Sequence, residues 1–132
     1  MINAKNELQE QLVSIPAKLE CADITREIYD FVKKQYFEIE IRLPVGYSEE
    51  EFTAFLTALN FDYDDGYGTQ ELYGTIWFDD GTWLERYEYD GSEWWVFKQY
   101  PVIPEYLSPE KCELDENFQQ GLVDNFKQFI KG

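Results

Sequence analysis

The chain has 132 residues, with 27 acidic side chains against 11 basic ones, a net charge of −16 and no histidine. Its 10 Phe, 10 Tyr and 4 Trp argue against disorder, and its lack of clustered Lys and Arg argues against direct binding to nucleic acid or to an anionic membrane. The absence of histidine excludes Ser–His–Asp triads, Cys–His pairs and His-ligated metals.

These properties predict one folded acidic domain over residues 1–132, because compact domains typically have about 100–150 residues. No apolar run approaches the ~20 residues of a membrane-spanning helix, and the N-terminus has no signal-peptide core. We therefore expect a cytoplasmic protein. Its two cysteines, Cys21 and Cys112, are isolated in the sequence, so we expect reduced thiols, with Cys21 in a core.

Two helices are predicted within the first 35 residues. Leu8, Leu12 and Ile15 recur at helical spacing before Pro16 interrupts the segment. A 3.6-residue period of mainly apolar residues then predicts a second helix over residues 17–35. Asp23 could instead be its N-cap, which would start that helix later.

A strand and a capped helix follow. Residues 36–43 alternate between apolar and polar side chains, which predicts a half-buried strand. Ser48 and Glu51 have the spacing of a capping box, which predicts a helix over residues 49–59. Four apolar residues at helical spacing form its expected buried stripe: Phe52, Phe55, Leu56 and Leu59.

Residues 71–100 predict three antiparallel strands separated by tight turns at Asp79-Asp80-Gly81 and Asp90-Gly91, because Gly and Asp tolerate the required positive φ. A final helix is expected over residues 115–130. The predicted order is α-α-β-α-β-β-β-α. This is an α+β fold with a mainly antiparallel sheet of about four strands, the meander at 71–100 and strand 36–43, packed by helices.

The register of the meander depends on the turns. Two-residue loops would pair Phe78 with Trp83 and Tyr87 with Trp94, whereas three-residue loops with a glycine bulge would flip the middle strand. Both alternatives put large aromatic side chains on both faces of the sheet. If helices cover one face, the other exposes Trp and Tyr among carboxylates, unless the chain termini or the Pro-rich segment cover it.

The acidic residues are concentrated in one region. Between Leu43 and Phe97 there are 13 acidic residues and one basic residue, Arg86. Solubility needs a net charge of only ~2–8 in a small domain, and alternate strand residues, ~6.6 Å apart, can present carboxylates as a phosphate-like array. A solvated acidic face is the simpler alternative. The residues expected to bind a partner are Glu49, Glu50, Glu51, Asp62, Asp64, Asp65, Asp79, Asp80, Glu85, Glu88, Asp90, Glu93, Trp77 and Trp95.

No motif indicates catalysis, a cofactor or a metal. Asn60, Asp62, Asp64 and Glu71 match four ligand positions of an EF-hand loop, but Asp65 stands where such a loop needs glycine. No buried carboxylate pair of the kind that hydrolyses glycosides is apparent, and no glycine-rich loop with a lysine could cradle phosphate. We therefore expect a protein that is not an enzyme.

One segment resembles a known group of proteins. The run GYGTQELYGTIWFDDGTWLERYEYDGSEWW, followed by PVIPEYL within residues 60–107, is similar to short acidic proteins encoded by phages and prophages, mostly of unassigned function. The resemblance implies an inhibitor acting in the host bacterial cytoplasm, of the anti-restriction or anti-CRISPR type.

The leading functional hypothesis is therefore a non-enzymatic inhibitor whose acidic, DNA-mimicking surface blocks a basic nucleic-acid-binding host protein. The alternative is an interaction or assembly module, including a homodimer, that uses an exposed aromatic face of the sheet.

Overall fold

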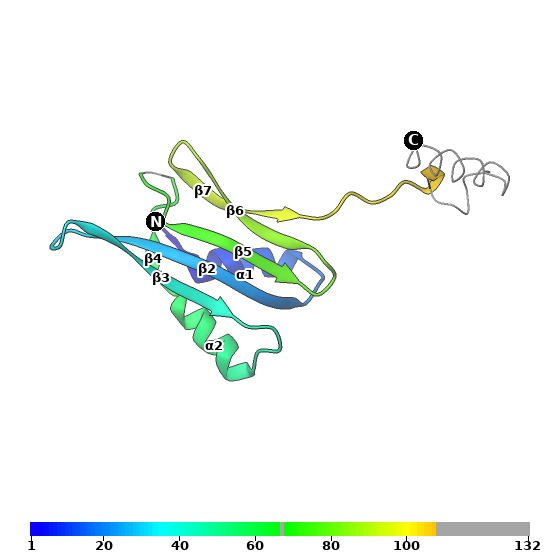
Figure 1. The fold of residues 1–132 in the computed structure, drawn as a ribbon, viewed down its shortest axis with the longest axis horizontal. Coiled ribbons are helices and arrows are strands. Elements are labelled where there is room, and N and C mark those ends of the chain that lie inside the picture. The colour runs from blue at the N-terminus through cyan, green and yellow to red at the C-terminus, as the bar shows by residue number, and fades with distance from the viewer. Residues whose placement is uncertain (67, 108–132) are drawn as a thin grey trace, which may run out of the picture. The chain divides into compact units, whose positions relative to one another are not determined.

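The computed structural model contains a five-stranded antiparallel sheet (Figure 1). Its strands, from one edge to the other, are β3 (Gln35–Leu43), β2 (Leu19–Asp30), β5 (Leu72–Phe78), β6 (Trp83–Tyr89) and β7 (Ser92–Lys98). The structure describes residues 1–66 and 68–107, and residues 1–100 form one compact unit, with residues 101–132 as a second. The expected helix at 115–130 lies outside the described residues.

The remaining elements are short. The helices α1 (Ala4–Ser14) and α2 (Glu49–Ala58) accompany a two-stranded sheet of β1 (Ile2–Asn3) and β4 (Asp62–Tyr63). In the second unit, residues 101–104 have no regular structure and η1 (Glu105–Leu107) is a single 3₁₀ turn. The α+β class and the mainly antiparallel sheet are confirmed, but the main sheet has five strands rather than four.

The helix predicted over residues 17–35 is wrong, because most of this stretch forms β2. Its apolar residues fit a helical period, yet Ala22 and Ile24 are buried while Asp23 between them is exposed, as in a strand. β2 pairs with β3 on one side and β5 on the other, so backbone hydrogen bonding along both edges of the strand outweighs its local helix propensity. Asp30 then closes the turn, its Oδ1 accepting from the backbone N–H of Val32 at 2.9 Å.

The two turns of the meander differ in length. At the first, Trp77 lies opposite Trp83, and the Phe78 N–H donates to the Thr82 carbonyl at 2.9 Å, which leaves a three-residue loop. Gly81 supplies the positive φ of 86° that this loop needs. At the second turn, Tyr89 lies opposite Ser92, so the loop has two residues. Of the two alternatives, the three-residue loop holds at the first turn, and the two-residue loop holds at the second, where Tyr87 pairs with Trp94.

The two helices cover one face of the sheet (Figure 1). Leu8 of α1 and Phe55 of α2 belong to the same core cluster as the inward-facing residues of the strands. Those inward-facing core residues are Leu19, Ala22, Ile24, Ile41, Leu43, Leu72, Ile76, Phe78, Leu84 and Trp95. We call this the covered face and the other side the open face, because no described element of residues 1–100 packs across it.

Local sequence signals account for α2. The Ser48 hydroxyl accepts from the Glu51 N–H at 3.1 Å, and the Glu51 carboxylate accepts from the Ser48 N–H at 3.1 Å, which confirms the capping box. Phe55 and Leu59 are buried, with Phe52 and Leu56 packed against the core, as the apolar stripe predicts. Cys21 differs from its prediction: it is half-buried on the open face, opposite Trp77, rather than in the core.

Candidate functional site

The open face of the sheet exposes large aromatic side chains. Tyr73 and Trp77 on β5, Tyr87 on β6 and Trp94 on β7 are each between 37% and 41% exposed. Their positions follow from strand alternation: each is one residue away from a buried neighbour on the covered face. Tyr87 and Trp94 lie directly opposite one another. Exposed aromatic residues grouped on one face are typical of protein-binding surfaces.

Carboxylates are interspersed with these rings. The strand residues that share the open face include five acidic ones, Asp23, Glu27, Glu38, Glu40 and Glu85, and two basic ones, Arg42 and Lys98. Arg42 bridges Asp23 at 3.2 Å and Glu40 at 3.0 Å. Lys98 lies 4.8 Å from the centre of the Tyr87 ring. The hydrogen bond with Tyr87 and the nearby Glu85 raise the pKa of Lys98. The face is therefore acidic and already holds one cation over an aromatic ring.

The acidic residues proposed from the sequence do not form a single patch. The first turn of α2 contains Glu49, Glu50 and Glu51, whose negative charges interact favourably with the positive end of the helix dipole. The turn at residues 79–81 and the turn at 90–91 lie at opposite ends of β6, a seven-residue strand that spans roughly 20 Å.

Several of these carboxylates accept hydrogen bonds from backbone N–H groups or from side chains. Asp62 accepts from the Asn3 amide, Asp64 from the Gly66 N–H and Asp79 from the Lys18 N–H. Asp80 accepts from the Thr82 hydroxyl and from the Thr82 N–H, and these two hydrogen bonds lower the pKa of Asp80. The remaining pairs are Glu85 with the Trp83 indole and Glu88 with the Gly91 N–H. Part of the acidity therefore stabilises turns and loops.

Glu93 and Trp95 do not belong to any exposed surface. Trp95 is 5% exposed on the covered face, and Glu93 is 2% exposed. The expected two-residue turn at Asp90-Gly91 is present, but β7 presents Glu93 and Trp95 inward and Trp94 outward. The aromatic residue that β7 offers to a partner is therefore Trp94 rather than Trp95.

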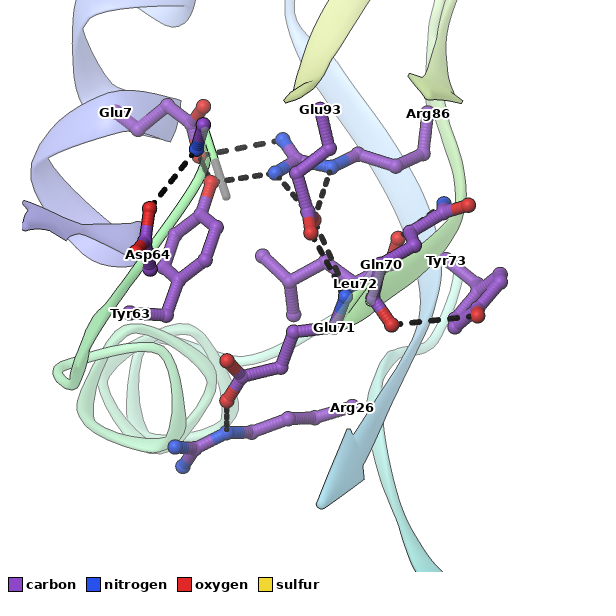
Figure 2. Close-up of polar contacts among 11 residues, drawn as sticks. Glu7, Arg26, Tyr63, Asp64, Gln70, Glu71, Leu72, Tyr73, Arg86 and Glu93 are labelled. Carbon is purple, nitrogen blue, oxygen red and sulfur yellow. Dashed lines mark hydrogen bonds and ion pairs between the residues drawn. The ribbon is translucent and has the colours of Figure 1, made fainter. Parts of the chain in front are cut away.

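A buried polar cluster lies at one end of the covered face (Figure 2). The Arg86 guanidinium contacts Glu93 Oε1 at 2.8 Å and Glu7 Oε1 at 3.2 Å, and its Nη2 donates to the Tyr63 hydroxyl. Tyr63 in turn donates to Glu7. Glu93 also accepts from the backbone N–H of Leu72 at 3.0 Å. The cluster joins α1, β4, β6 and β7 to the start of β5.

Burial shifts the pKa values in this cluster. Burial raises the pKa of Glu7, although Tyr63 and Arg86 act in the opposite direction. Burial and the hydrogen bond to Glu7 raise the pKa of Tyr63 well above its ordinary value. For Arg86, burial disfavours the charge, but Glu7 and Glu93 outweigh it and the pKa is raised. Among the described residues no buried side-chain polar atom lacks a hydrogen-bond partner, so the cluster is a satisfied structural network.

The cluster contains buried carboxylates that sequence reasoning did not find. The available signal was Arg86 itself, the one basic residue between Leu43 and Phe97. A lone arginine in a strongly acidic, half-buried strand needs carboxylate partners if its side chain turns inward. Nothing local identified Glu7, which lies 79 residues away in the sequence.

Within the described ranges, no group of three or more His, Cys, Asp or Glu residues is placed to hold a metal ion. All four residues that match EF-hand ligand positions have other partners. Asn60 accepts from the Asn3 amide, and Asp64 accepts from the Gly66 N–H. Asp62 accepts from Asn3, and Glu71 forms an ion pair with Arg26 at 2.8 Å.

Comparisons with protein-family models, curated proteins and solved structures give no match. The resemblance to phage-encoded proteins therefore stays a prediction from the sequence. Among the described helices, none has the length and apolar character needed to cross a membrane.

Proposed function

We propose that this chain is a non-enzymatic binding module that docks the open face of its sheet onto a basic surface of another protein. The observation that supports it best is the group of four half-exposed aromatic side chains on that face: Tyr73, Trp77, Tyr87 and Trp94. Tyr and Trp contribute much of the energy at protein interfaces, because they bury a large area for few rotatable bonds.

The charges on the same face favour a basic partner. Five carboxylates accompany two basic residues, and Arg42 is already bridged to Asp23 and Glu40. Arginine and lysine from a partner would gain both carboxylate contacts and aromatic faces, as Lys98 does over Tyr87. The net charge of −16 would speed the encounter with such a surface at low salt.

Paired variants test this role. Proteins captured from a bacterial lysate by the wild-type chain are compared with those captured by Trp77→Ala/Trp94→Ala and by Val13→Ala/Val45→Ala, and affinities are then measured with the purified partner. Val13 in α1 and Val45 in the loop after β3 are exposed and lie outside the strands that carry the four rings. We expect the tryptophan variant to bind a basic partner at least about tenfold more weakly and the valine control to bind like wild type. Equal affinities for all three proteins would refute the proposal.

The second candidate is the DNA-mimic inhibitor, favoured by the 13 acidic residues between Leu43 and Phe97. It differs from the leading proposal in the groups that touch the partner. If charge mimicry carries binding, Asp79→Lys/Asp80→Lys/Asp90→Lys should abolish it, and duplex DNA should compete for the partner. If the aromatic face carries binding, this triple variant keeps most of its affinity and Trp77→Ala/Trp94→Ala does not.

A further inference from the structure

A cavity of about 490 Å³ lies at the end of the β2–β3 hairpin. The ladder between β2 and β5 ends at Arg26 opposite Leu72, and the Glu27 N–H makes one more bond, to the Glu71 carbonyl at 2.8 Å. The last three residues of β2 pair with β3 alone. Beyond that point Thr69, Gln70 and Glu71 run beside the hairpin and close the other side of the cavity. A cavity of this volume is within the ~300–1,000 Å³ range of ligand sites.

Three aromatic rings line the hairpin side of this cavity. The Tyr29 ring lies 4.8 Å from Phe31 at an angle of 86° and 4.9 Å from Tyr36 at 61°. None of the three belongs to the hydrophobic core, and Phe31 is 83% exposed on the turn. These rings pack on one another outside the core, so core packing does not account for the cluster.

Carboxylates accompany the rings. Glu27 lines the cavity and lies directly opposite Glu38 in the sheet register. Like charges opposite one another destabilise an antiparallel pair, and a bound cation would relieve the repulsion. Glu71 also lines the cavity, but its carboxylate is bound by Arg26 (Figure 2). The lysines of the turn, Lys33 and Lys34, are not among the lining residues.

Tyr73 on the open face lies beside this cavity, because it contacts Gln70 of the lining. The Tyr73 hydroxyl donates to the Gln70 carbonyl at 3.3 Å, as Figure 2 shows. Glu27 lines the cavity and, by the register of β2 with β5, lies on the same face of the sheet as Tyr73. Burial and this neighbouring carboxylate raise the pKa of Tyr73. A partner seated on the open face could therefore insert a side chain here.

We infer that this cavity is a binding site for the guanidinium group of an arginine side chain. A planar guanidinium stacks on aromatic rings and donates to a carboxylate at the same time. The chain uses the same combination internally: Arg26 lies 3.5 Å from the centre of the Phe61 ring and is paired with Glu71. The inference that this arginine belongs to a partner protein rests on the proposed function. The inference that the cavity binds a guanidinium group does not.

The experiment uses the full chain and two small probes, N-acetyl-arginine methylamide and its uncharged citrulline counterpart, followed by ¹H–¹⁵N NMR titration. We expect saturable shifts with the arginine probe at residues 27–37 and 69–71, and none with the citrulline probe. Tyr36→Leu and Glu27→Gln should each weaken arginine binding about threefold to fivefold. Tyr89→Leu, which removes an exposed tyrosine that does not line the cavity, should leave it unchanged.

Shifts that are scattered over all carboxylates, or that are equal for the two probes, would overturn the inference. So would arginine binding that is unaffected in Tyr36→Leu while the spectrum of the core stays that of the wild type. The two proposals can fail separately. If the cavity does not bind arginine but Trp77→Ala/Trp94→Ala still weakens binding to a basic partner, the proposed function stands without this site. If the cavity binds arginine but the tryptophan variant keeps its partner, this site stands and the proposed function fails.

Discussion

Arg86 Nη2 lies 2.8 Å from Glu93 Oε1, and each of these two side chains is 1% exposed. The two residues belong to neighbouring strands, and the Glu93 carboxylate also receives the backbone N–H groups of Glu71 and Leu72. The pair therefore fixes the entry of the chain into β5 as well as the β6–β7 hairpin. The ion pair has a structural role, because removing one partner leaves the other as an uncompensated buried charge.

Replacing Arg86 should destabilise the fold strongly. We expect Arg86→Met to lower the free energy of unfolding by about 3–5 kcal/mol, since Glu93 and Glu7 lose their cation. Urea denaturation followed by tryptophan fluorescence measures this. The matched control is Arg42→Met, whose ion pairs are exposed and whose loss should leave the unfolding midpoint nearly unchanged. Equal effects of the two changes would contradict the structural role of the cluster.

Trp94 and Trp95 are adjacent in the sequence but lie on opposite faces of β7. Trp95→Ala should cost about 3–5 kcal/mol of stability, because it opens a cavity in the core. Trp94→Ala should cost much less and should instead weaken partner binding. Urea denaturation of the two variants checks the first outcome, and the affinity for the captured partner checks the second. A larger loss of stability from Trp94→Ala would show that the faces are assigned incorrectly.

Glu7 should make stability depend on pH. Its pKa is raised above the ordinary 4.5 by burial in the folded state, so the folded chain holds this proton more tightly than the unfolded chain. The resulting stabilisation is complete below about pH 4.5 and is lost as pH rises through the folded-state pKa. Wild type should therefore lose stability relative to Glu7→Gln as pH rises above 4.5, measured by urea denaturation across a pH series. A difference that is constant with pH, or that grows in favour of wild type, would contradict this.

Gly74 should not tolerate a side chain. Its φ is +140°, and a Cβ placed there would lie 2.2 Å from the Asp23 carbonyl oxygen, a backbone atom of the neighbouring β2. We expect Gly74→Ala to lower the free energy of unfolding by at least about 2 kcal/mol through strain and overpacking. Gly66→Ala is the control, because nothing lies within 4 Å of a Cβ there. Thermal unfolding of both variants measures the difference, and similar melting temperatures would count against this β2–β5 pairing.

Local signals were sufficient for several elements. The Ser48–Glu51 capping box and the aspartate–glycine turns near Gly81 and Gly91 act over a few residues, so their structural meaning is contained in the adjacent sequence. The helix predicted over residues 17–35 was wrong because the apolar spacing there suits a helix, whereas strand pairing on both sides decided the outcome. The loop length at residues 79–81 was likewise open, and it sets which face each residue of β6 occupies.

The sequence by itself determined that this is a folded, strongly acidic α+β chain with an aromatic antiparallel meander, because composition, periodicity and turn residues act locally. Tertiary structure decided which aromatic residues are exposed, because helices cover only one face and a single step of register exchanges the faces. It also decided that Glu93 is buried beside Arg86 rather than offered to a partner. These outcomes depend on contacts between residues far apart in the sequence, as Glu7 and Arg86 illustrate.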